Sequence, residues 1–173
     1  MMKPAKTIAL SAICAAISAL ILVLGEFFPT LSLGAAFTAG IVVMVPLAKN
    51  SYKGATLTFF AAAILAFLIS YFRYEAVLPF AAFFGLQPII NKIQSDRGWN
   101  KYIMLAIKDV WFVGMLVGYY FLFSLALFPN NDELNAFSLP ILIAGGAIAY
   151  FVYDGLSFYF QKYIDLTVRR LKL

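Results

Sequence analysis

Six apolar stretches dominate the chain and decide in which solvent it can fold. A helix needs about 20 mostly apolar residues to cross the hydrocarbon core of a bilayer. Polar or turn-forming clusters divide the sequence into segments of this kind at residues 7–27, 33–48, 54–72, 76–91, 103–128 and 137–161. Charged residues make up only 12% of the chain and hydrophobic residues 64%. We therefore expect an all-α integral membrane protein, with six transmembrane helices in one compact domain over residues 1–173.

The distribution of Lys and Arg predicts how these helices are oriented. Basic residues collect on the cytoplasmic side of membrane proteins. With six spans, Arg73 is the only one of the 13 basic residues predicted on the side opposite the N-terminus. This asymmetry places both termini in the cytoplasm and favours an even number of spans. We expect a multi-pass protein of the cell membrane of a bacterium, in contact with the lipid bilayer.

Several kinds of chemistry are excluded by what the sequence lacks. It contains no histidine, a single cysteine (Cys14) and no Gly-x-x-x-x-Gly-Lys-Ser/Thr phosphate loop. Histidine-dependent nucleophiles, most zinc sites and P-loop binding of ATP are therefore absent. We expect no enzyme activity, no cofactor, no metal site and no nucleic-acid partner.

Small residues recur along the first apolar segment. Ala5, Ala9, Ala12, Ala16 and Ala19 follow one another at spacings of four and three residues, which places them in one stripe of a helix. Such a stripe lets another helix approach closely, and packing of this kind drives helix association in lipid. The partner can be a helix of the same chain or of another protein, and both interpretations stay open.

Charged residues inside the apolar segments are rarer. Asp154 lies deep in the last segment, where an unpaired carboxylate costs several kcal/mol. Lys108 and Asp109 enter the fifth segment from the cytoplasmic side, and we expect Lys108 to pair with Asp154. The pair can serve as a structural clamp or in conformational coupling. Gln87 and Asn91, four residues apart, can join the same polar region.

Polar and aromatic residues gather at the predicted outer ends of the first four segments. Arg73 can give two parallel hydrogen bonds to a carboxylate or phosphate, and Tyr71 and Tyr74 can stack on a flat ligand. With Glu26 and Glu75 they form a candidate substrate-binding site. The alternative is an aromatic belt that anchors the protein at the membrane surface.

The chain resembles the substrate-binding S components of energy-coupling factor transporters. It shares their small size, six predicted spans, internal termini, short basic lead and Ala-rich first helix, and Phe83 to Ile93 (FFGLQPIINKI) is similar to small bacterial membrane proteins grouped with them. The resemblance implies that Ala12 and Ala16, extended by Ala9 and Ala19, dock on a membrane coupling subunit. It also implies that separate cytoplasmic ATPase subunits supply energy and that the loop at residues 27–32 closes an outward-facing pocket.

The substrate implied by the resemblance is a vitamin or similar small nutrient. Members that carry nickel or cobalt present a histidine near the N-terminus, and this chain has none. Two other classes of function stay open. One is a non-transporting membrane scaffold that resembles the MreD proteins of the cell-shape machinery. The other is a small ion-coupled carrier in which Asp154 and Lys108 respond to protonation or sodium.

Overall fold

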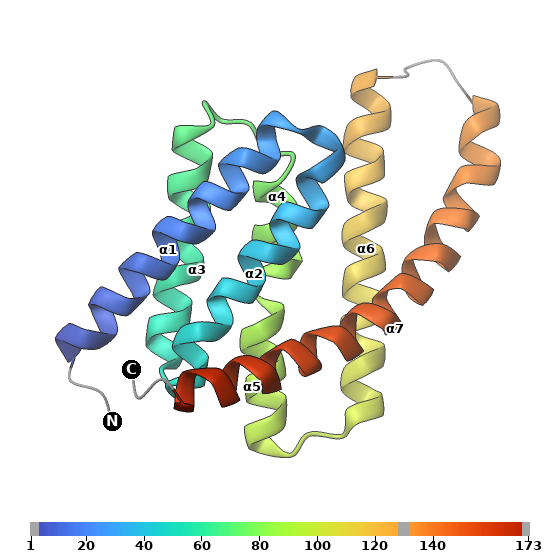
Figure 1. Cartoon of the computed structure of the whole chain (residues 1–173). Helices are drawn as coiled ribbons and strands as arrows, with labels where there is room; N and C mark the ends of the chain where they lie inside the picture. Colours follow the sequence, from blue (N-terminus) through green and yellow to red (C-terminus); the bar gives the residue numbers. More distant parts are fainter. Residues whose placement is uncertain (1–3, 128–131, 171–173) are drawn as a thin grey trace. The chain divides into compact units, whose positions relative to one another are not determined.

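The computed structural model describes residues 4–127 and 132–170, and every element within these ranges is helical (Figure 1). The elements in chain order are α1 (Pro4–Phe27), the 3-10 turn η1 (Pro29–Leu31), α2 (Ser32–Ala48), α3 (Tyr52–Ile69), α4 (Val77–Pro79), the π-helical turn η2 (Phe80–Phe84), α5 (Gln87–Arg97), α6 (Lys101–Leu127) and α7 (Asp132–Arg170). Two compact units result. Unit 1 comprises Met1–Gly98 with Ser157–Leu173, and unit 2 comprises Trp99–Leu156.

Four helices in the described part of the chain are long and apolar enough to cross a membrane. These stretches are Ala5–Phe27, Tyr52–Ile69, Lys101–Phe121 and Leu139–Val168. The apolar helix α2 is shorter, with 17 residues. An α-helical membrane protein agrees with this finding, whereas the count of six spans and the cytoplasmic termini stay predictions. Two ends differ clearly: α5 continues to Arg97, beyond the predicted end at residue 91, and α7 continues to Arg170, beyond the predicted end at residue 161.

Small residues on one face of α1 bring it close to α2 and α3 in unit 1. Ser11, Cys14, Ala15, Ser18 and Ala19 are all buried on this face. The Ser18 hydroxyl donates to the main-chain oxygen of Ala39 in α2 at 3.2 Å. The Thr58 hydroxyl of α3 lies 3.2 Å from the main-chain oxygen of Ser11. Short side chains allow this approach, and their hydroxyl groups find acceptors within the bundle.

The predicted fourth helix is a broken helical path made of α4, η2 and α5. In η2 the N–H of Gly85 donates to the Phe80 oxygen at 2.8 Å, which is the five-residue step of a π-helix. Pro88 stands in the first turn of α5, where a proline is tolerated because its missing N–H would have no helical partner. The path ends at Gly98, whose φ of 63° is the left-handed conformation that glycine adopts easily.

The C-terminal end of α5 is tied to the start of α3. Tyr52 donates a hydrogen bond from its hydroxyl to Asp96, and Lys92 Nζ lies 3.2 Å from the other carboxylate oxygen of Asp96. These hydrogen bonds, Tyr52 foremost, hold the pKa of Asp96 below its ordinary value. The contacts fix α5 within unit 1.

Unit 2 is a pair of helices, α6 and the first part of α7. Gly146 of α7 is buried against α6, since a Cβ atom at this position would lie 2.9 Å from Leu116 Cδ1. Phe112 of α6 packs on Tyr150 and Tyr153 of α7, with ring centroids 5.4 Å and 6.3 Å away. Small and aromatic residues therefore share this interface.

Gly40 of α2 marks a close approach between α2 and η2 in unit 1. A Cβ atom on Gly40 would lie 2.5 Å from the main-chain oxygen of Phe84 in η2, whereas one on Gly34 of the same helix would meet nothing within 4 Å. Gly40→Ala should therefore lower the free energy of unfolding by about 1–3 kcal/mol because the backbones must separate. Gly34→Ala should leave it unchanged or raise it by up to about 1 kcal/mol, since alanine favours helix.

Detergent-solubilised variants compared by thermal or denaturant unfolding test this difference. Equal stabilities of Gly40→Ala and Gly34→Ala would contradict the close contact between α2 and η2.

Candidate functional site

The carboxylate of Glu26 connects the end of α1 to the start of the broken helix. It is 1% exposed and accepts three main-chain hydrogen bonds. The donors are the N–H groups of Glu75 at 3.1 Å, Ala76 at 2.8 Å and Val77 at 3.1 Å. The first N–H groups of a helix have no helical acceptor and carry partial positive charge, so a buried carboxylate is well placed there. Glu26 therefore acts as a cap for α4.

Arg73 and Glu75 surround this cap. Arg73 Nη1 donates to the main-chain oxygen of Glu26 at 3.2 Å. Glu75 is half-buried, and its burial raises the pKa of its carboxyl group, with a further rise from the negative charge and hydrogen bond of Glu26. The positive charge of Arg73 acts in the opposite direction. Three of the five predicted substrate-binding residues thus lie together in unit 1.

The two tyrosines of the predicted site are both exposed, and Tyr74 is 45% exposed. Tyr71 follows the end of α3 with a φ of 55° and is 91% exposed. Phe72, with a φ of 63°, donates its N–H to the Phe67 oxygen at 2.9 Å, and the Phe67 and Phe72 rings meet at 5.1 Å. This is a helix ending of the kind usually made by glycine. Tyr71 is thus held at the tip of the turn, and contact of any of these residues with a ligand stays a prediction.

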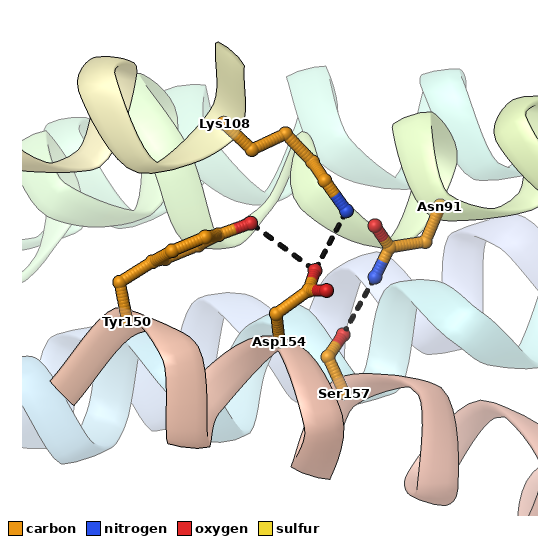
Figure 2. A network of polar contacts seen from close by, with 5 residues as sticks. All are labelled: Asn91, Lys108, Tyr150, Asp154 and Ser157. Carbon is orange, nitrogen blue, oxygen red and sulfur yellow. Dashed lines mark hydrogen bonds and ion pairs between the residues drawn. The ribbon is translucent and has the colours of Figure 1, made fainter. Parts of the chain in front are cut away.

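A buried ion pair joins the two helices of unit 2 (Figure 2). Lys108 Nζ of α6 lies 2.6 Å from Asp154 Oδ1 of α7, and the Tyr150 hydroxyl donates to the same oxygen at 3.1 Å. Both charged side chains are buried in apolar surroundings, where the charge of each balances the charge of the other. Asp109, expected beside them, takes no part in this ion pair and is only half-buried.

A second polar contact in Figure 2 belongs to unit 1. Asn91 Nδ2 of α5 donates to Ser157 Oγ of α7 at 3.1 Å, and both side chains are fully buried. Gln94 and Gln161 lie one turn farther along these two helices and are buried as well. Sequence reasoning missed Gln94, Gln161, Ser157 and Tyr150, although the spacings Gln87, Asn91, Gln94 and Ser157, Gln161 place each set on one helical face.

The predicted docking stripe on α1 is divided between two faces. Ala9, Ala12 and Ala16 are exposed, whereas Ala19 is 3% exposed and packs inside unit 1. The expectation that Ala19 extends an accessible stripe is corrected by this burial, because three residues after Ala16 the helix has turned toward its neighbours. Ala5 is also exposed, so an accessible stripe of four alanines runs from Ala5 to Ala16.

Comparison with known proteins gives no relative for this chain. It matches no protein-family model, no curated protein and no solved structure. The residues and contacts described above therefore carry the functional proposal.

Removal of the Glu26 carboxylate should destabilise unit 1. Glu26→Ala leaves three main-chain N–H groups without their acceptor, and we expect the free energy of unfolding to fall by about 2–4 kcal/mol. Glu26→Gln keeps one acceptor oxygen and should lose less. Unfolding of the purified variants in detergent provides the measurement, and a Glu26→Ala protein as stable as the wild type would show that the cap is unimportant.

Stability should also depend on pH through Glu75. Its pKa is raised in the folded protein, so between the ordinary value and the raised value the folded state binds more protons than the unfolded chain. Ionisation of Glu75 therefore costs stability as the pH rises through this window, and the cost is absent below the ordinary pKa. Glu75→Gln removes the titration and should be more stable than the wild type at neutral pH.

The test follows the unfolding midpoints of both proteins from acidic to neutral pH. The advantage of Glu75→Gln should disappear toward low pH. An advantage that is constant across the range, or a deficit at neutral pH, would contradict the assigned role of Glu75.

Proposed function

We propose that the protein is the substrate-binding membrane subunit of an uptake transporter of the energy-coupling factor type. In this proposal it binds a vitamin or similar small nutrient from outside the cell. A membrane coupling subunit and separate cytoplasmic ATPase subunits supply the energy. The observation that carries the proposal is the exposed alanine stripe on α1, formed by Ala5, Ala9, Ala12 and Ala16.

This stripe is more than the packing of unit 1 requires. The contacts of α1 with α2 and α3 already use another set of small residues, of which Ser11, Ala15 and Ser18 are buried. On the outer face the exposed Ile13, Ile17 and Leu24 lie beside the alanines. Large apolar side chains suit a surface that faces lipid, whereas a stripe of alanines suits close contact with another helix. The division of the face therefore supports a partner helix on the alanine side.

The charge pattern supports the same arrangement. The predicted cytoplasmic side is rich in Lys and Arg, and the opposite side carries Arg73 as its one basic residue. The sequence has no P-loop, so in this proposal the energy from ATP comes from other subunits. The outer residues Glu26, Tyr71, Arg73, Tyr74 and Glu75 remain the proposed entrance for the substrate, with Glu26 holding the backbone rather than contacting the ligand directly.

Bulky substitutions in the stripe test the proposal. Ala12→Trp and Ala16→Trp should abolish co-purification of the coupling and ATPase subunits from native membranes, because the indole ring prevents close helix approach. Ile17→Trp is the matched control, since it places the same side chain on the other part of the exposed face. It should retain the partners, and all three variants should unfold like the wild type.

Mass spectrometry of the proteins recovered in mild detergent identifies the partners. ATPase subunits lost only from the alanine variants would support the proposal. Cell-wall or cytoskeletal proteins in their place would overturn it in favour of a scaffold, and unchanged recovery with all variants would remove the stripe from docking.

A further inference from the structure

A buried polar seam runs between α5 and the C-terminal part of α7, entirely within unit 1. We define it by the six residues Gln87, Asn91 and Gln94 of α5 and Ser157, Gln161 and Asp165 of α7. The spacings of three and four residues place each set on one face of its helix. All are buried except Asp165, which is half-buried. Amide side chains are seldom fully buried, so a row of them inside an apolar protein needs a physical reason.

The hydrogen bond between Asn91 and Ser157 shows that the two faces meet. Asn91 Nδ2 lies 3.1 Å from Ser157 Oγ, and both residues are 0% exposed (Figure 2). Gln94 is the next residue of this face on α5, and Gln161 and Asp165 are the next two on α7. Gln94 and Gln161 therefore lie one turn, and Asp165 two turns, from this contact along their helices.

Three oxygen atoms of the seam lack a donor. Among the described residues, no hydrogen-bond partner reaches the buried atoms Gln94 Oε1, Gln161 Oε1 and Asp165 Oδ1. Gln94 and Gln161 are 5% and 7% exposed, respectively. An unsatisfied polar group of this kind is costly in apolar surroundings. Because all three atoms are acceptors, the missing partner carries positive charge or donates hydrogen bonds.

We propose that the seam binds a monovalent cation, with sodium as its physiological class of ligand. Small hard cations prefer oxygen ligands, which amide, hydroxyl and carboxylate groups supply. Asp165 is the single acid of the seam, so one positive charge is balanced and a second would stay uncompensated in apolar surroundings. The seam also begins directly after η2, and interrupted helices are a common setting for sodium sites in membrane proteins.

This inference goes beyond the proposed function, because a cation site in unit 1 requires no partner protein. Its natural consequence is a sodium-dependent conformation of the broken helix, since the ion would connect α5 with α7. A transporter subunit with such a site would change its affinity for substrate with the sodium concentration wherever its two conformations bind the substrate differently.

The experiment uses the purified full-length protein in detergent, without partners. Thermal unfolding is followed while NaCl replaces choline chloride at constant ionic strength, and binding of radioactive sodium is measured in parallel. A bound cation stabilises the folded state by mass action, so the midpoint should rise with sodium and then saturate. We expect about one sodium ion per chain. An identical midpoint in both salts together with no bound sodium would overturn the proposal.

Three variants locate the site. Gln94→Leu and Gln161→Leu remove one proposed ligand each and should abolish the sodium-dependent rise, whereas Gln161→Glu keeps an oxygen ligand and should retain it. Ser18→Ala is the control for a buried hydrogen bond lost elsewhere in unit 1, and it should lower the midpoint but keep the full sodium response. A response retained by both leucine variants would place the cation elsewhere and overturn the assignment.

The outcome is distinguishable from that of the docking experiment. A sodium response with no ATPase partner would leave the seam assigned and refute the proposed transporter. Partner recovery without a sodium response would refute the seam alone.

Discussion

Buried polar groups in an apolar surrounding need partners from within the protein, and this constraint accounts for the arrangement of unit 1. Ser18 and Thr58 direct their hydroxyl groups to main-chain oxygens where α1 meets α2 and α3. Glu26 instead supplies an acceptor, because its carboxylate accepts hydrogen bonds from the main-chain N–H groups at the start of the broken helix. In both cases a short or buried polar side chain fixes two backbones at close range. The contacts of α4, η2 and α5 with the rest of unit 1 depend on these fixed positions.

The small residues of α1 serve two purposes that the sequence alone could not separate. One set is buried and sets the distance to α2 and α3, and the other is exposed on a neighbouring face. All five alanines fall in one stripe by spacing, yet Ala19 belongs to the buried set. An α-helix completes one turn every 3.6 residues. A stripe with alternating spacings of three and four residues is therefore wide enough to reach both faces. Only the positions of α2 and α3 show where the boundary lies.

The helix positions were largely predictable, whereas the roles of polar residues were not. Apolar runs and the polar clusters between them located the helices within a few residues, since length and hydropathy determine them. The end of α7 was missed because its last turns are amphipathic, with Gln161 and Val168 buried between exposed residues. The capping role of Glu26 was not predicted because its partners are main-chain atoms, which leave no pattern in the sequence. One of them belongs to Ala76, 50 residues later.

The outer cluster and the polar seam differ in the state of their oxygen atoms, and this difference bears on where a ligand binds. At the outer cluster, the oxygens of Glu26 already accept three hydrogen bonds, so a ligand would have to break a stable cap to reach them. In the seam, Gln94 and Gln161 present acceptors that the described residues do not use. Binding there gives a donor to buried acceptors that otherwise have none, which removes the cost of leaving them unsatisfied. A bound species would therefore contribute most to stability in the seam, whereas the Glu26 cap positions the broken helix beside the proposed substrate entrance.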